Sequence, residues 1–218
     1  MALELPPLYA IVDPEQTRSR PAERLLTALL EAGVTILQLR VKALPPGDFL
    51  ELAKETHAIT RAHHCRLIIN DRIDIALACD ADGVHLGQDD LPLGGGRKFM
   101  RDKIVGISTH DLDQARAAER DGADYIGFGP IFGTRTKATI YEPRGPAMLQ
   151  QIRSAVKLPI VAIGGITEEN VQGVWQAGAD SVAIISDILH DDNPGAKALR
   201  ILNQGRTVQR RRYGSPEI

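Results

Sequence analysis

The stretch Asp121-Gly-Ala-Asp-Tyr-Ile-Gly-Phe-Gly129 reads as the end of a helix followed by a strand, and this joint recurs along the chain. Its first half is polar and carries a glycine, as is common where a helix ends in a left-handed cap. Its second half is a short apolar run, which is typical of a buried strand. Similar joints occur around Gly33, Gly83 and Gly178, so we expect each of these glycines to end a helix.

Short apolar runs alternate along the chain with stretches of helical spacing, and this alternation predicts a parallel sheet with crossover helices. The first helical stretch places Leu25, Leu26, Leu29 and Leu30 on one face. The eight predicted strands are Leu8–Val12, Ile36–Leu39, Leu67–Asn70, Gly83–Leu86, Ile104–Ile107, Tyr125–Gly129, Ile160–Ile163 and Ser181–Ile185.

Eight pairs of a strand and a following helix within 218 residues favour the α/β class, with a single (β/α)8 TIM barrel. The alternative, an open doubly wound sheet, would carry a Gly-x-Gly-x-x-Gly turn after its first strand. The first strand here ends instead in Val12-Asp13-Pro14. We therefore expect one barrel domain over residues 1–202. Residues 203–218 lack apolar periodicity and are predicted to form a basic, frayed and flexible tail.

Composition excludes several classes of partner. A net charge of −2 gives no overall attraction to nucleic acid or to an anionic membrane, and the Arg210–Arg212 cluster is too short to change this expectation.

No apolar run is long enough to span a bilayer, and the first residues lack the pattern of a secretory signal, so a cytoplasmic location is expected. Cys65 and Cys79 lack metal-ligand spacing and are predicted core residues. A homo-oligomer is compatible with the sequence.

Charged side chains follow the second predicted strand. In a barrel the active site is assembled at the C-terminal ends of the strands. Strand alternation places Gln38, Arg40 and Lys42 on one face, which we expect to be the barrel interior near its mouth. A solvated sheet edge could also carry such charges, but a closed barrel has no edge. Two inward cations without partners are costly to bury, and they therefore predict a bound anion.

Acidic residues follow the next two strands. The third strand ends in Asn70-Asp71-Arg72, and the fourth is followed by Asp89 and Asp90. These carboxylates could be structural partners of the nearby cations. The alternative is a Mg²⁺ site, because Mg²⁺ commonly takes one or two carboxylates together with phosphate oxygens. Cations and a metal at one mouth indicate a diphosphate.

The remaining strand ends carry hydroxyls and glycines. Ser108 follows the fifth strand, and the segment Thr134-Arg-Thr-Lys137 follows the sixth, where it could bind a ligand or cap the next helix. Gly164-Gly165 follows the seventh strand and Ile185-Ser186 the eighth. Many barrels bind a monophosphate with these last two loops. The sequence thus predicts two phosphate subsites at one mouth.

Six motifs in order along the chain resemble the thiamine phosphate synthase family over Leu8 to Leu202. They are Gln38-Leu-Arg-Val-Lys42, Ile69-Asn-Asp-Arg72, His85-Leu-Gly-Gln-Asp-Asp90, Gly106-Ile-Ser-Thr-His110, Gly129-Pro-Ile-Phe-Gly-Thr-Arg-Thr-Lys137 and Ala162-Ile-Gly-Gly-Ile166. One motif alone would be weak, but six on consecutive strands are specific. The family joins a hydroxymethylpyrimidine diphosphate to a thiazole phosphate, which gives thiamine phosphate and pyrophosphate.

The resemblance implies a role for each matching residue. Mg²⁺ is expected on Asp71 and Asp90, with Asp89 the less favoured acid. The expected catalytic residues are Arg40, Lys42, Ser108 and Lys137. The expected substrate-binding residues are Gln38, Arg40, Lys42, Asn70, Ser108 and Lys137 on the pyrimidine diphosphate side and Thr134, Thr136, Gly164, Ile185 and Ser186 on the thiazole phosphate side, with Leu39, Val41 and Arg135 assigned to neither side.

The implied reaction is dissociative: pyrophosphate leaves, and the thiazole nitrogen captures the pyrimidine-methyl cation. It needs no activated nucleophile, and the sequence shows no convincing nucleophile and base pair. A related thiazole tautomerase would need a proton-transferring residue instead, such as His85 or His110. A non-catalytic phosphate-sensing barrel would lack the strand-end charges, and a sugar-phosphate isomerase or lyase would need an inward glutamate or lysine.

Overall fold

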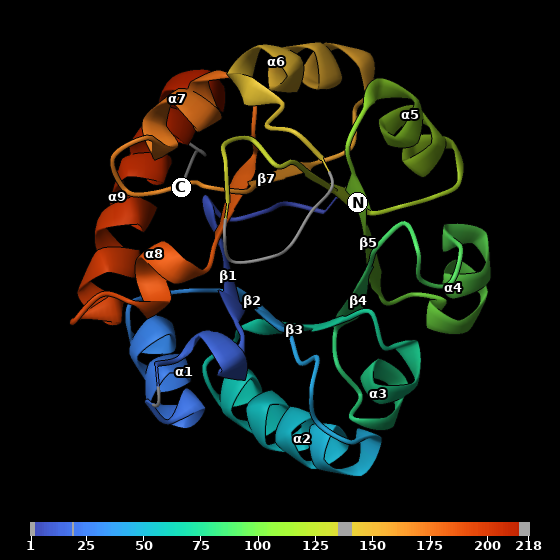
Figure 1. Ribbon diagram of the computed structural model, residues 1–218, viewed down its shortest axis with the longest axis vertical. Coiled ribbons are helices and arrows are strands. Elements are labelled where there is room, and N and C mark those ends of the chain that lie inside the picture. The colour runs from blue at the N-terminus through green and yellow to red at the C-terminus, as the bar shows by residue number, and fades with distance from the viewer. Residues whose placement is uncertain (1–2, 19, 135–140, 214–218) are drawn as a thin grey trace.

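The computed structural model describes residues 3–18, 20–134 and 141–213, and it shows a closed barrel of eight parallel strands in chain order (Figure 1). The last strand pairs with the first, with Tyr9 opposite Ala183. This confirms the predicted (β/α)8 barrel. The strands are β1 (Leu8–Val12), β2 (Ile36–Leu39), β3 (Arg66–Asn70), β4 (Gly83–Leu86), β5 (Ile104–Thr109), β6 (Tyr125–Phe128), β7 (Ile160–Ile163) and β8 (Ser181–Ile184).

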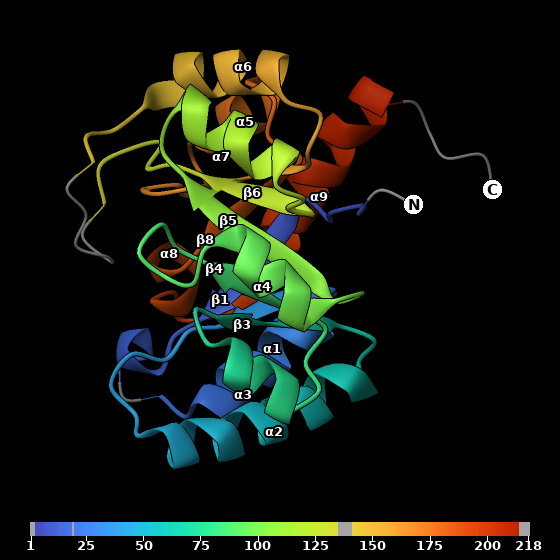
Figure 2. The same ribbon diagram turned by 90° about the vertical axis from the view of Figure 1, so that its right-hand side faces the viewer.

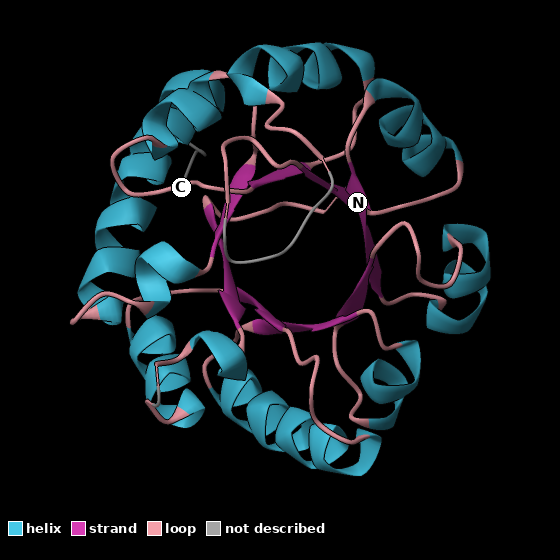
Figure 3. Ribbon diagram, in the orientation of Figure 1, coloured by secondary structure: helices cyan, strands magenta, loops and turns pink. Residues whose placement is uncertain are grey.

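Helices surround the strands as an outer ring (Figure 3). They are α1 (Ala22–Glu31), α2 (Pro46–Ala62), α3 (Ile73–Ala78), α4 (Leu93–Met100), α5 (Leu112–Arg120), α6 (Gly145–Ala155), α7 (Val171–Gln176), α8 (Ser186–Leu189) and α9 (Pro194–Tyr213). The long helix α9 packs against α1 and α7 and completes the ring. Within the described residues, none of these helices has the length and apolar character needed to cross a bilayer.

Helix α9 corrects the predicted tail. The sequence suggested a frayed segment from residue 203, yet the helix continues through this point as far as Tyr213. Ile201 and Leu202 are buried, and Val208 packs partly against the same core. Gln209 Nε2 donates to Asp180 O at 2.8 Å. The apolar spacing of this segment was overlooked because polar residues separate its few anchoring side chains. Residues 214–218 lie outside the described part.

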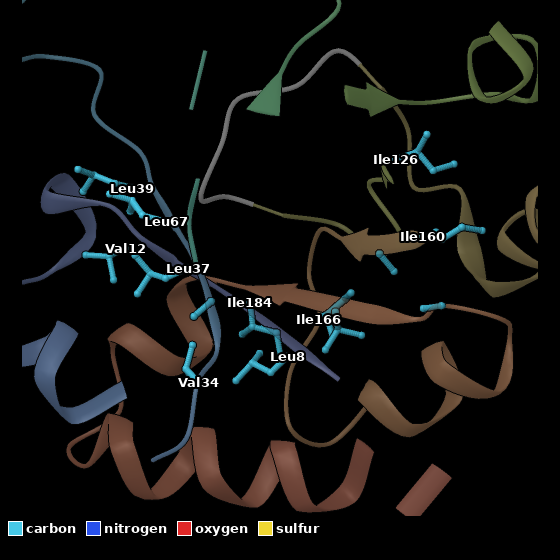
Figure 4. Packing of buried hydrophobic residues seen from close by; sticks show 14 of the residues in the cluster. Leu8, Val12, Val34, Leu37, Leu39, Leu67, Ile126, Ile160, Ile166 and Ile184 are labelled. Carbon is cyan, nitrogen blue, oxygen red and sulfur yellow. The ribbon is translucent and has the colours of Figure 1, made fainter. Parts of the chain in front are cut away.

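Two apolar clusters hold the barrel together, because successive strand side chains point to opposite faces. On β1, Leu8, Ala10 and Val12 face the helices and belong to the larger, outer cluster. Figure 4 shows ten labelled members of this cluster between strands and helices. Tyr9 and Ile11 point the other way, into an inner cluster that fills the barrel. The inner cluster is the base on which the mouth is built.

The joints between helices and strands follow the expected pattern with one exception. Gly33, Gly122 and Gly178 have φ of 89°, 87° and 114°, which is the left-handed conformation predicted for them. Gly83 does not share it, because it already lies in β4, and Asp80 adopts the positive φ at that joint. A Cβ on Gly83 would lie 2.4 Å from Ile104 O, so this glycine serves close strand packing instead.

An aspartate at three of these joints ties two strands together. Asp82 directly precedes β4, Asp124 precedes β6 and Asp180 precedes β8. Each carboxylate accepts a hydrogen bond from a backbone N–H of the preceding strand. The acceptor distances are 2.7 Å for Asp82 and Asp124 and 2.8 Å for Asp180. We call these three residues the aspartate clamps. They lie at the N-terminal ends of the strands, away from the mouth.

Replacing Asp180 by alanine is expected to lower stability without changing the mouth. The carboxylate accepts from Ile160 N at 2.8 Å and from Arg153 Nη1 at 2.8 Å, so its loss leaves both donors without this acceptor. We expect a loss of about 2 kcal/mol in the free energy of unfolding. Thermal unfolding of Asp180→Ala against exposed Asp192→Ala would measure it. Equal melting temperatures would contradict the role of the clamp.

Both cysteines are buried, as predicted, and we expect them to react slowly in the folded protein. Burial raises the pKa of the Cys65 thiol to about 12, and burial also raises the pKa of Cys79. Because the thiolate is the reactive form, alkylation at pH 8 should be at least about a hundredfold slower than that of a free thiol. Mass spectrometry of alkylated native and denatured protein would test this. Rapid native labelling at either cysteine would contradict it.

Candidate active site

A cavity of about 930 Å³ opens at the C-terminal ends of the strands. Its walls include residues from every strand end, among them Asn70 and Asp71 after β3 and Ile185 and Ser186 after β8. Figure 2 shows α8 at this end of the barrel and the C-terminal end of α9 at the opposite end. The cavity therefore lies where the sequence placed the site.

The two cations after β2 line the cavity and have carboxylate partners. Arg40 pairs with Asp13, which is fully buried at the end of β1, and Lys42 pairs with Asp71. Both cations line the cavity, as expected, but the expectation that they lack partners is wrong. Asp13 was missed because the sequence Val12-Asp13-Pro14 carried no motif. Asp13 also accepts from Glu15 N at 2.9 Å, which fixes the turn beneath Arg40.

Leu39 and Val41 lie between these cavity residues in the sequence but point the other way. Leu39 belongs to the outer cluster, and Val41 packs partly against it. Neither side chain lines the cavity. Gln38, on the inward face, is buried and lines the cavity, as alternation predicts. A substrate contact at Leu39 or Val41 would therefore have to use the backbone.

Two acidic side chains meet on the adjacent wall. Asp71 and Asp90 hydrogen-bond to each other, and Gly87 N donates to Asp90 Oδ2 at 2.6 Å. Burial by itself would raise the pKa of Asp71, but hydrogen bonds from Lys42 and Asp90 hold that pKa below its usual value. Burial raises the pKa of Asp90, and the Asp71 carboxylate adds to that rise. Of the two carboxyl groups, Asp90 therefore takes up a proton more readily than Asp71.

This pair fits a divalent cation. Like charges in contact repel, and a cation between them removes that repulsion. Mg²⁺ commonly uses one or two carboxylates and takes its other ligands from water and phosphate. No group of three or more metal-ligating side chains occurs within the described residues, so a complete protein cage is absent there. Asp89 lines the same rim but is exposed.

Polar side chains cross the floor of the cavity in one continuous chain. Gln38 Nε2 donates to Tyr9 Oη at 3.1 Å, and Tyr9 Oη lies 2.7 Å from Tyr125 Oη. Tyr125 Oη lies 3.0 Å from His85 Nδ1, and His85 Nε2 lies 2.9 Å from Ser108 Oγ. We call these five residues the floor chain. The sequence pointed to Gln38 and Ser108 but missed both tyrosines, because inward tyrosines on short strands look like ordinary core residues.

The opposite wall is formed by the glycine pair after β7. Gly164 and Gly165 both have positive φ, 101° and 62°. Phe132 N donates to Gly164 O at 2.9 Å, and a Cβ on Gly164 would lie 2.6 Å from Pro130 Cβ. The glycines therefore allow the loop after β6 to pack closely on the loop after β7. Thr134, Gly164, Ile185 and Ser186 all line the cavity. Arg135, Thr136 and Lys137 lie outside the described residues.

Fold and site together define an α/β-barrel enzyme whose active site lies at the C-terminal ends of its strands. The family model described as thiamine monophosphate synthase matches residues 8–188. The chain belongs to this family, and it is a transferase of thiamine biosynthesis.

Individual relatives agree with this assignment. A thiamine-phosphate synthase of Halalkalibacterium halodurans is 48% identical over 183 residues, which are 84% of this chain and 87% of that protein. One of Chloroflexus aurantiacus is 43% identical over 89% of this chain and 90% of its own. The solved thiamine phosphate pyrophosphorylase from Pyrococcus furiosus is 32% identical, with a TM-score of 0.85 and coverage of 93% and 96%. A 3-hexulose-6-phosphate synthase structure, 16% identical with a TM-score of 0.68, shares the fold alone.

Proposed function

We propose that the cavity joins 4-amino-2-methyl-5-(diphosphooxymethyl)pyrimidine to a thiazole phosphate. The carrying observation is the division of one cavity into a wall with cations and acids and a wall with paired glycines. The first wall suits a diphosphate with a divalent cation. The second wall, with its positive φ glycines, suits the close approach of a monophosphate. The volume of about 930 Å³ accommodates two small molecules.

The proposed reaction breaks the bond between the methylene carbon and the diphosphate oxygen, and the bonding electrons leave with pyrophosphate. The ring amino group delocalises the resulting cation, and the thiazole nitrogen donates its lone pair to form the new carbon–nitrogen bond. Negative charge grows on the leaving group. Ion pairs with Asp13 and Asp71 already hold Arg40 and Lys42 in position. The two cations would therefore stabilise this negative charge without first having to reorient.

Other groups complete the proposed site. Lys137 would add a further cation, by resemblance. Asp71 and Asp90 would hold Mg²⁺, whose charge would stabilise the departing pyrophosphate. The apolar side chains of Val161, Ala183 and Ile185 line the same cavity and would limit water near the reactive cation.

Incubation of the protein with both phosphorylated precursors tests the proposal directly. Thiamine phosphate and pyrophosphate should appear in equal amounts with Mg²⁺ and should disappear when a chelator removes the metal. Excess Mg²⁺ added after the chelator should restore both products. Absence of product under every metal condition would overturn the proposed substrates, and equal rates with and without the chelator would overturn the metal site.

Replacing Ser108 by alanine should lower kcat about a hundredfold, which is the usual cost of removing one preorganised donor to a developing charge. Ser108 Oγ lies at the cavity end of the floor chain, so the change removes a hydroxyl without disturbing the strand. Steady-state kinetics with both substrates saturating would measure the loss. A kcat within threefold of the parent enzyme would rule out this donor.

A further inference from the structure

We propose that the floor chain is directional, with every proton pointing from Gln38 toward Ser108. Tyr125 and His85 then act as positioning residues that keep the Ser108 hydroxyl aimed into the cavity. The inference rests on the proposed function, in which Ser108 donates to the diphosphate. It goes further by naming Tyr125 and His85 as the residues that set the orientation of the Ser108 hydroxyl.

The direction begins at the amide of Gln38. Its Nε2 can only donate, so Tyr9 Oη is the acceptor in that bond. Burial raises the pKa of Tyr9 and of Tyr125 well above the usual range, so each hydroxyl keeps its single proton. Tyr9 is 1% exposed, and within the described residues Tyr125 Oη is the other hydrogen-bond partner of its hydroxyl. The Tyr9 proton therefore points to Tyr125.

The opposite arrangement has a structural cost. If Tyr125 donated to Tyr9, the Tyr9 oxygen would accept two hydrogen bonds, and its own proton would have no acceptor among the described residues. An unsatisfied buried donor is disfavoured. With the Tyr9 proton on the Tyr125 oxygen, Tyr125 donates its own proton to His85 Nδ1 at 3.0 Å. The direction passes intact from one tyrosine to the next.

The imidazole transmits this direction to Ser108. A neutral histidine whose Nδ1 accepts must carry its proton on Nε2. His85 Nε2 then donates to Ser108 Oγ at 2.9 Å. Ser108 Oγ is thus an acceptor toward His85, and its own proton is available to an acceptor in the cavity. An anionic phosphate oxygen is such an acceptor.

Two glycines make room for this chain. A Cβ on Gly106 would lie 2.1 Å from Cζ of Tyr125, and a Cβ on Gly127 would lie 2.9 Å from Cε1 of His85. The rings of His85 and Tyr125 stack with centroids 5.5 Å apart in the space so left. Tyr125 and His85 are therefore held in place by neighbouring strands as well as by their hydrogen bonds.

Two matched variants test the direction. Tyr125→Phe removes the donor to His85 Nδ1, so we expect kcat to fall about tenfold or more, as for a displaced donor in a preorganised site. Tyr9→Phe also deletes one buried hydroxyl of the floor chain, but Tyr125 can still donate to His85. We expect its kcat to fall less than about threefold. Melting temperatures of both variants control for packing.

A double variant separates orientation from packing. Because Tyr125 acts through Ser108, adding Tyr125→Phe to Ser108→Ala should cost less than about twofold further in kcat. A merely structural tyrosine would cost the same in both backgrounds. Equal kcat losses in the two single phenylalanine variants, or full additivity in the double variant, would overturn the proposal.

The tautomer of His85 gives a readout independent of activity. Side-chain ¹⁵N NMR of the intact protein should show an Nε2–H tautomer, assigned by the signal that His85→Asn removes. The same tautomer should persist in Tyr9→Phe and change in Tyr125→Phe. An Nδ1–H tautomer in the parent protein would overturn the direction even if Tyr125→Phe fails to fold. Absence of thiamine phosphate would instead overturn the proposed function and leave the tautomer result standing.

Discussion

Asp71→Asn is expected to lower kcat by at least about a hundredfold while the barrel remains folded. The carboxylate contacts both Lys42 and Asp90, so its loss removes a cation partner and one of the two acids proposed to hold Mg²⁺. Asparagine suits this position, because Asp71 has φ of 62° and asparagine tolerates the left-handed region better than alanine does.

Kinetics over a range of Mg²⁺ concentrations would measure this effect, because a damaged metal site should also shift the concentration needed for half-maximal rate. Asp74→Asn is a matched control: Asp74 lies three residues further along, in the first turn of α3, is exposed and pairs with Arg72. It should leave kcat within about twofold, as surface substitutions usually do. Retention of a tenth or more of the parent kcat by Asp71→Asn would contradict the metal role.

Gly129→Ala is expected to prevent stable folding. Gly129 directly follows β6, beside β7, and an added Cβ would lie 2.1 Å from Ile163 O and 3.0 Å from Ile163 C. These are backbone atoms, and Ile163 O also accepts from Ile131 N at 2.9 Å, so they cannot move aside without breaking the loop. We expect a loss of more than about 4 kcal/mol in the free energy of unfolding, which the protein can hardly tolerate.

Gly133→Ala provides the control in the same loop. Among the residues that the structure describes, none has an atom within 4 Å of its added Cβ, and its φ lies outside the left-handed region. Soluble yield and thermal unfolding of the two variants would be compared. If Gly129→Ala melts within a few degrees of Gly133→Ala, the close approach of the two strands would not be a constraint on folding.

The architecture and the mouth could be predicted from the sequence because both depend on local patterns. Alternating apolar runs and helical spacing fixed the strand order, and the last residues of each strand had to meet at one end. Gln38 and Ser108 were found in this way, and the structure places both in the cavity wall. The roles assigned to Arg135, Thr136 and Lys137 remain predictions.

The partners of these residues could not be predicted, because they come from distant strands. Asp13 neutralises Arg40 across the β1–β2 boundary, and Tyr9 meets Tyr125 across the barrel, although 116 positions separate them in the chain. Asp80 replaces a glycine in the left-handed position at the joint before β4, which a search for glycine alone overlooks. Composition likewise could not reveal that α9 continues to Tyr213.

The aspartate clamps have a consequence for how such a chain can evolve. A clamp precedes every second strand from β4 onward, namely Asp82, Asp124 and Asp180. Each one links its strand to the preceding strand by a hydrogen bond. The barrel is thus partly modular, and these three stabilising contacts lie at the N-terminal ends of the strands, remote from the cavity. Substitutions of side chains around the mouth leave the hydrogen bonds of the aspartate clamps in place. Side chains that only line the mouth can therefore change while the clamps stay intact, whereas positions of close backbone contact such as Gly129 cannot.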